Sequence, residues 1–182
     1  MSYSSRSAYQ ETLIRSRLEL LASVSLFGLG VVLGATVPSL TEPAGGLPTF
    51  TVEYFLRHNT RILFGLWLGA PLFGIPTVLG LVLNGSVFAN AVATSSIPIA
   101  HRLALLFPHV VFELPGIFVA GCVGLKPFGA FVRYLVERQS RPMTPTDVRD
   151  LLRLAVLSLV LIAVAGALEA LVTPSVVGFV TG

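Results

Sequence analysis

The sequence predicts an all-α integral membrane protein, a polytopic helical bundle with about five membrane segments. Charged residues make up only 12% of the chain, whereas an average soluble domain contains about 25%. Hydrophobic residues make up 54%, and the mean hydropathy is +0.84. They form long uncharged stretches. We therefore expect residues 1–182 to form a single membrane domain with the lipid bilayer as a partner.

The first uncharged stretch runs from Leu20 to Thr41. It is longer than the core of a cleaved signal peptide, which has roughly 7–15 residues, so we expect it to remain as a membrane span. Ser7 and Gln10 have the spacing of a helix-capping box. A helix should therefore begin after Ser7 and continue into this span. The proline- and glycine-rich residues beyond Thr41 predict a loop.

The second uncharged stretch, from Ile62 to Ala100, is too long for one crossing of about 20 residues. Asn84 and Gly85 both tolerate positive φ, and this dipeptide predicts a turn. The turn would divide the stretch into two membrane segments, Ile62–Leu83 and Ser86–Ala100.

The third uncharged stretch is the least lipid-like, because prolines, a histidine and a glutamate interrupt residues 103–125. Residues 86–125 are expected either to cross the membrane twice or to form a re-entrant pair. Around residues 127–138, apolar and basic side chains recur at helical spacing, which predicts an interfacial amphipathic helix. The last membrane helix should begin at Pro145, with Thr144 as its N-cap.

Basic residues predict the orientation in the membrane. One side of the predicted spans contains Arg6, Arg15, Arg17, Lys126, Arg133, Arg138, Arg141, Arg149 and Arg153, and the other contains Arg57, Arg61 and Arg102. The positive-inside rule places the N-terminus and residues 126–153 in the cytoplasm and the C-terminus outside the cell membrane. The net charge of +3 is small and dispersed, so we expect no nucleic-acid partner.

The motif Pro108-His109-x-x-x-Glu113-Leu114-Pro115 contains the most informative polar pair. In a helix, His109 and Glu113 lie four residues apart and share a face. A charge near the middle of the bilayer costs about 2.5–3.5 kcal/mol, so Glu113 should be protonated, paired or in contact with water. Two interpretations remain open: a site for proton relay, cation coordination or gating, and a polar contact that fixes helix packing. These ligands are too few for a closed metal site, and we expect no cofactor.

Small residues recur at four-residue spacing in three predicted spans, an arrangement that allows two helix backbones to approach closely. These residues are Gly30, Gly34, Gly65, Gly69, Gly116, Ala120 and Gly124. They predict helix packing within one subunit or, alternatively, contacts in a homo-oligomer.

A set of polar and small residues is similar to a known family pattern. It comprises Phe55, Asn59, Asn84, Gly85, Pro108, His109, Glu113, Leu114, Pro115, Ala120 and Gly124. The pattern resembles the stage II sporulation protein M family over roughly residues 50–135, and its Pro-His-x-x-x-Glu element is the most specific part. The resemblance implies a multi-pass scaffold in the engulfment machinery of sporulating bacteria, with partners that degrade peptidoglycan. Val110 replaces the glycine common after the histidine, which favours a helical path there.

The functional expectation is a non-enzymatic protein, because the sequence contains no HExxH, GxSxG or phosphate-binding glycine loop. We expect a scaffold or subunit of a membrane complex that binds other membrane proteins or further copies of itself. The alternative is a channel or transporter component for a small solute or ion that uses the His109/Glu113 region.

Overall fold

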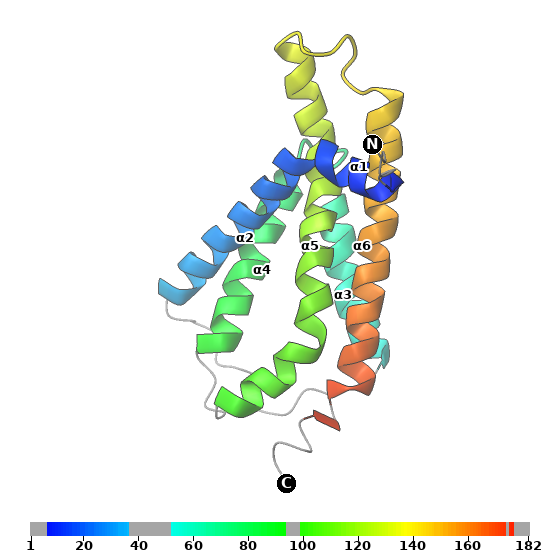
Figure 1. Ribbon diagram of the computed structural model, residues 1–182. Coiled ribbons are helices and arrows are strands. Elements are labelled where there is room, and N and C mark those ends of the chain that lie inside the picture. The colour runs from blue at the N-terminus through cyan, green and yellow to red at the C-terminus, as the bar shows by residue number, and fades with distance from the viewer. Residues whose placement is uncertain (1–6, 37–51, 94–98, 174, 177–182) are drawn as a thin grey trace, which may run out of the picture.

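The computed structural model describes residues 7–36, 52–93, 99–173 and 175–176, and these residues form helices and turns with no strand. The helices are α1 (Ala8–Arg15), α2 (Arg17–Thr36), α3 (Val52–Trp67), α4 (Ile75–Ala93), α5 (Ile99–Leu135) and α6 (Pro145–Leu171). Figure 1 shows α2 to α6 side by side in a bundle, with α1 lying across one end. We term this end the α1 end. The start of α5 and the end of α6 lie at the opposite end.

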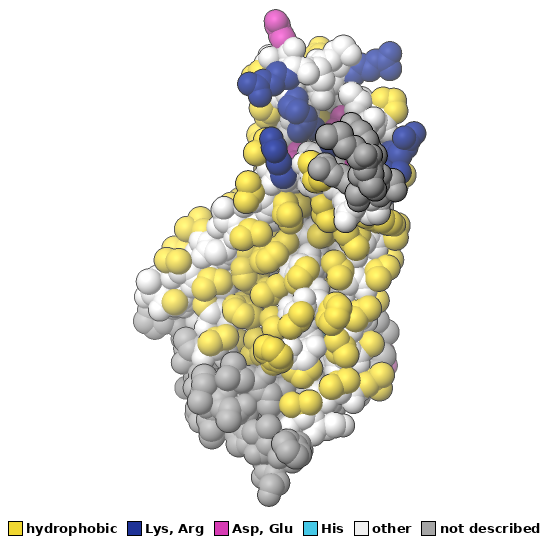
Figure 2. Space-filling model, viewed as in Figure 1, with side chains coloured by type: hydrophobic (Ala, Val, Ile, Leu, Met, Phe, Trp, Pro, Cys, Tyr) yellow, Lys and Arg dark blue, Asp and Glu magenta, His cyan; other side chains and the backbone are white. Residues whose placement is uncertain are grey.

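Four helices are long and apolar enough to cross a membrane: Arg17–Thr36 in α2, Ile75–Val92 in α4, Leu106–Leu135 in α5 and Pro145–Leu171 in α6. Helix α3, with 16 residues, is shorter. Apolar side chains cover the middle of the molecule in Figure 2, whereas the basic side chains visible in this view gather at the α1 end. An apolar surface beside a charged end is typical of a helical bundle in a bilayer. The predicted helical membrane bundle is confirmed.

The N-terminal capping box is confirmed, but the predicted continuous helix is not. The Ser7 hydroxyl oxygen accepts a hydrogen bond from the backbone N–H of Gln10, and the backbone N–H of Ser7 donates one to Oε1 of Gln10. Helix α1 then ends at Ser16, whose φ of −102° and ψ of 17° depart from helical geometry. The chain changes direction there, so α1 crosses the bundle end while α2 continues along the bundle (Figure 1).

The predicted turn at Asn84-Gly85 is wrong, because α4 passes through both residues. Asn84 Nδ2 donates to the carbonyl of Gly80 on the preceding turn, 2.7 Å away, and so supports the helix. A side chain at Gly85 would clash with the backbone of Phe27 on α2. Gly85 therefore serves close helix packing rather than a turn.

The actual turn between the second and third bundle segments lies in residues 68–74, which contain Pro71. Phe73 and Gly74 both have positive φ there, 51° and 82°. The predicted segments Ile62–Leu83 and Ser86–Ala100 are therefore replaced by α3 and α4. A re-entrant pair over residues 86–125 is also wrong, because residues 86–93 complete α4 and residues 99–125 belong to the single helix α5; residues 94–98 lie outside the described residues.

Helix α5 contains three prolines, Pro108, Pro115 and Pro127, within its 37 residues. Figure 1 shows its first part bending away from the rest, as prolines inside a helix cause. Residues 127–135 are helical, but they extend α5 instead of forming a separate interfacial helix. Helix α6 begins as predicted: Thr144 is its N-cap, in a capping box with Asp147.

Most of the predicted small residues pack against a neighbouring segment. Side chains added at Gly30 and Gly34 would clash with the α4 backbone at Val82 and Ser86. Gly69 and Gly124 both lie against Thr77, and Gly116 lies against Ile162. Nothing lies within 4 Å of the position that a side chain would take at Gly65. Ala120 belongs to the largest apolar core cluster, which consists of Phe27, Leu63, Leu66, Leu81, Ile117, Ala120 and Ile162.

Candidate functional site

Two polar clusters lie at different levels of the bundle, and both are built on α5 and α6. One contains His109 on α5, and the other contains Lys126 on the same helix. These residues are separated by 17 positions in the chain, which corresponds to about 25 Å along a helix. That separation approaches the thickness of a hydrocarbon core, about 30 Å. We term the first the His109 cluster; it consists of Asn59, His109, Glu113 and Glu169. We term the second the α1-end network; it consists of Thr12, Arg15, Ser16, Glu19, Lys126, Arg133, Asp147 and Asp150.

His109 and Glu113 share one face of α5, as the sequence predicts. His109 is only 9% exposed, and its Nε2 lies 3.6 Å from Glu113 Oε2. The same nitrogen lies 3.9 Å from Oε1 of Glu169 on α6. Glu169 is not among the site residues predicted from the sequence. The packing of α5 against α6 brings the two carboxyl groups to one imidazole.

Asn59, on α3, lies beside α6 near the rest of this cluster. It is 4% exposed, and a side chain at Gly166 would lie 3.5 Å from Asn59 Nδ2. Gly166 precedes Glu169 by about one turn of α6. Among the described residues, Asn59 Nδ2 and His109 Nδ1 are buried nitrogens with no hydrogen-bond partner.

The His109 cluster can hold protons on a histidine and two carboxyl groups. Both nitrogen–oxygen separations exceed hydrogen-bonding distance, so the contacts are electrostatic. Among the described residues, no group of three His, Cys, Asp or Glu side chains is arranged to hold a metal ion. The chemistry that this arrangement offers is therefore proton exchange and a polar link between α5 and α6.

The other family-pattern residues do not gather around His109. Asn84 and Gly85 lie on α4, where Gly85 contacts α2. Pro108 and Pro115 flank the pair within α5. Phe55 belongs to α3, but its side chain lies outside the described set. Of the predicted residues, the structure thus brings Asn59, His109 and Glu113 to one region.

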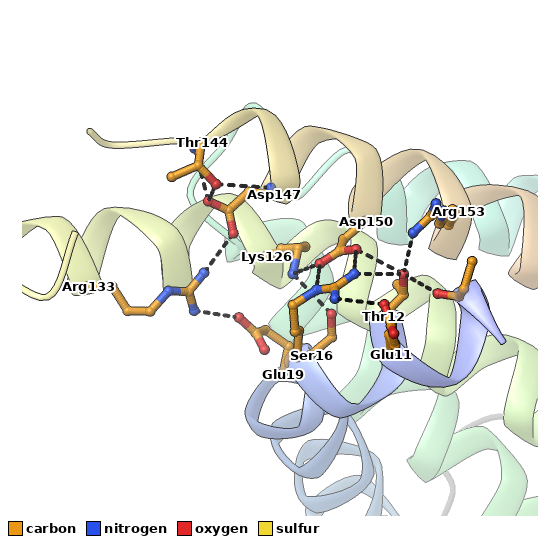
Figure 3. A network of polar contacts seen from close by, with 12 residues as sticks. Glu11, Thr12, Ser16, Glu19, Lys126, Arg133, Thr144, Asp147, Asp150 and Arg153 are labelled. Atoms are coloured by element: carbon orange, nitrogen blue, oxygen red, sulfur yellow. Dashed lines mark hydrogen bonds and ion pairs between the residues drawn. The ribbon is translucent and has the colours of Figure 1, made fainter. Parts of the chain in front are cut away.

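Asp150 is the centre of the α1-end network (Figure 3). It lies on α6 and is 1% exposed. Its carboxylate accepts hydrogen bonds from Nε and Nη2 of Arg15, at 2.9 and 2.7 Å, and from Oγ1 of Thr12, at 2.8 Å. Hydrogen bonding to Asp150 raises the pKa of Arg15 above its ordinary value. One buried carboxylate therefore fastens α1 to α6.

Lys126 connects α5 to the same carboxylate. It is 1% exposed, and its Nζ lies 3.6 Å from Asp150 Oδ2. The ammonium group also donates to Ser16 Oγ at 3.0 Å, so it contacts the residue at which α1 ends. Burial of an unpaired lysine is costly, whereas an opposite charge and a hydrogen bond offset that cost.

Arg133, two helical turns beyond Lys126, forms the other half of the network. Its guanidinium lies 3.1 Å from Glu19 Oε1 on α2 and 3.1 Å from Asp147 Oδ1 on α6. From the sequence, these basic residues indicate only the orientation in the membrane. Their partners could not be identified, because Lys126 and Ser16 are 110 positions apart and Arg15 and Asp150 are 135 apart.

Comparisons with known proteins agree with the resemblance. The family model for stage II sporulation protein M matches residues 20–174, which include α2 to α6 except the first residues of α2. An uncharacterized protein of Methanocaldococcus jannaschii is 25% identical over 171 residues, covering 88% of this chain and 96% of that protein. No solved structure matches. The chain therefore belongs to the stage II sporulation protein M family.

Proposed function

We propose that the protein is a non-enzymatic scaffold or subunit of a membrane complex, and that it binds its partner through a projecting hairpin. This hairpin consists of residues 127–149: the end of α5, the connecting residues 136–144 and the start of α6. Figure 1 shows it extending beyond α1. The excess of basic residues at this end favours a cytoplasmic location for the hairpin.

The observation that carries the proposal is that side-chain contacts hold the projecting hairpin in shape. Gln139 Nε2 donates to the carbonyl oxygens of Ala130, Arg141 and Pro142, at 2.7, 2.8 and 3.2 Å. Arg133 ties α5 to Asp147 at the start of α6. A surface ordered before binding loses less conformational entropy when a partner docks.

The surface of the projecting hairpin has a composition suited to protein contact. Tyr134, Leu135 and Val136 are exposed apolar side chains, and the exposed charged residues Glu137 and Arg138 follow them. Aromatic, apolar and arginine side chains in one patch are typical of protein interfaces. The partner is therefore another membrane protein with a cytoplasmic segment, or a second copy of this chain.

Site-specific cross-linking tests the proposal. A photo-reactive residue replaces Leu135 in the projecting hairpin or, as a control, Leu159 in the lipid-facing part of α6; both side chains are exposed. In native membranes, the Leu135 position should give one stoichiometric cross-linked product, and the Leu159 position should not. A protein that stays a lone monomer in mild detergent and gives no product from Leu135 contradicts the scaffold assignment.

A channel or transporter component is the second candidate, favoured by the unpartnered buried nitrogens of Asn59 and His109. Buried polar atoms normally have a partner, and water or a solute can supply one. Ion flux into vesicles containing purified protein tests this role. Loss of flux in Glu113→Gln, with Glu137→Gln unaffected, would support transport. Equal loss of stability in Glu113→Gln and Glu113→Leu, without a flux phenotype, would assign the pair to helix packing.

A further inference from the structure

Two pockets adjoin each other at the α1 end, and one is polar. The polar pocket has a volume of about 470 Å³. Side chains from α1, α2, α5 and α6 line it, including Arg15, Arg17, Lys126, Arg133, Asp147 and Asp150. It therefore includes the charged groups of the α1-end network other than Glu19, together with Arg17, which belongs to no described ion pair of that network.

The second pocket is an apolar groove of about 450 Å³ between α2, α4 and the last part of α5. Its apolar lining includes Leu18, Leu26, Val78, Leu125, Phe128 and Val132. Leu18, Phe128 and Val132 are exposed, so the groove opens on the surface that faces lipid. Leu18 and Arg133 line both pockets, and the polar pocket and the apolar groove are therefore neighbours.

The charges around the two pockets favour an anion. Their linings contain more cations than carboxylates: Arg15, Arg17, Lys126, Arg133 and Arg138 against Glu19, Asp147 and Asp150. Every one of these carboxylates already pairs with a cation of the network. Arg17 and Arg138 form no ion pair with any described residue, and both are exposed. They supply positive charge that the described part of the chain leaves unmatched.

We propose that this pair of pockets binds one anionic phospholipid, with its phosphate in the polar pocket near Arg17 and an acyl chain in the apolar groove. Arginine binds phosphate through charge-assisted hydrogen bonds, and the groove offers apolar side chains to the hydrocarbon. The junction between the apolar belt and the charged end, seen in Figure 2, is where lipid headgroups lie in a bilayer. A phospholipid has an anionic headgroup next to apolar acyl chains, and it therefore matches the polar pocket and the apolar groove at this junction.

The binding site does not depend on the scaffold role, because lipid binding is measured on the purified protein without a partner. The full chain in a neutral detergent is titrated with phosphatidylglycerol, phosphatidylcholine or inorganic phosphate, and the rise in Tm is recorded. Phosphatidylglycerol should stabilise the protein at the lowest concentration, with little effect from phosphatidylcholine. Equal stabilisation by the two lipids, or by inorganic phosphate alone, would overturn the proposal.

Matched variants locate the site. Arg17→Gln removes an unpaired cation of the polar pocket, whereas Arg149→Gln removes an exposed cation of α6 outside both linings. Loss of one cation near a membrane surface corresponds to an affinity decrease of about fivefold, which we expect for Arg17→Gln and not for Arg149→Gln. Val132→Trp, which fills the apolar groove, should weaken binding of phosphatidylglycerol but not of a short-chain analogue. Equal losses in Arg17→Gln and Arg149→Gln would show general charge attraction and exclude the site.

Discussion

The two polar clusters of this bundle use the same two long helices in different ways. In the α1-end network, Asp150 contacts two cations and a hydroxyl group that come from α1 and α5. In the His109 cluster, two carboxyl groups contact one imidazole without a hydrogen bond, and two buried nitrogens lack a described partner. Asp150, whose charge is fully matched, serves as a structural connection, although Glu19 Oε2 in the same network is buried without a hydrogen-bond partner. The incompletely matched groups around His109 remain available for titration or for a ligand.

The largest expected effect is at Asp150. Asp150→Ala leaves the buried ammonium of Lys126 without its counter-charge, and breaking a buried ion pair in this way costs about 3–5 kcal/mol. Arg15 is 39% exposed at its side chain and can turn toward water, so Lys126 should dominate the loss. The free energy of unfolding in detergent measures it.

A compensated variant sharpens the test of Asp150. Combining Asp150→Leu with Lys126→Met replaces both buried charges by apolar groups and should recover much of the lost stability. If the double variant is no more stable than Asp150→Ala, then unpaired charge is not the cause of the loss. Glu137→Ala, an exposed change at the same end, should have almost no effect.

Arg133→Gln should have the second largest effect. It removes charge-assisted hydrogen bonds to Glu19 and Asp147, and each such bond contributes about 1.5–3 kcal/mol. The Arg133 side chain is 31% exposed, so solvent screens its charge. The total loss of stability should therefore be about 1.5 kcal/mol, the lower limit for one such bond. Denaturant unfolding measures the loss, and Arg149→Gln serves as the exposed control. Equal stability of the two variants would remove Arg133 from the network.

Thr12→Val tests the neutral part of the α1-end network. The Thr12 hydroxyl donates to Asp150 at 2.8 Å, and valine has nearly the same shape without this donor. A loss of about 1 kcal/mol is expected, with faster proteolysis within α1 as a local readout. Thr146→Val, at an exposed position of α6, is the control. An unchanged rate of proteolysis in Thr12→Val would mean that Arg15 alone anchors α1.

Local features of the fold could be predicted from the sequence, and contacts between distant residues could not. Both predicted N-caps, Ser7 and Thr144, are found where their residues predict them, because a cap depends on residues about three positions apart. The Asn84-Gly85 dipeptide predicts a turn, but Asn84 bonds within its own helix and Gly85 allows α2 to approach. In lipid, a continuous helix satisfies its own backbone groups. Whether residues 84–85 form a turn or continue a helix therefore depends on the packing of α2 against α4, which the dipeptide alone does not reveal.

The candidate sites show the same division. His109 and Glu113 could be paired from sequence because four positions along a helix place them together. Glu169 joined them only through the packing of α6 against α5. The α1-end network has a partial sequence signal, because Lys126 and Arg133 on α5, and Asp147 and Asp150 on α6, recur at helical spacing. That spacing shows which residues share a face, but not which face meets another.

The smallest expected effect is at Glu169, and it decides whether the two clusters really differ. Glu169→Gln keeps the side-chain shape and breaks no hydrogen bond, because the contact with His109 Nε2 is 3.9 Å. We expect a loss below about 0.5 kcal/mol. Asp150→Asn makes the same chemical change at the α1 end but leaves the buried ammonium of Lys126 without its counter-charge, so it should cost about 3–5 kcal/mol. Unfolding of both variants in the same detergent gives the comparison. Equal losses would mean that the His109 cluster is also a structural connection, and the case for a titratable site there would fail.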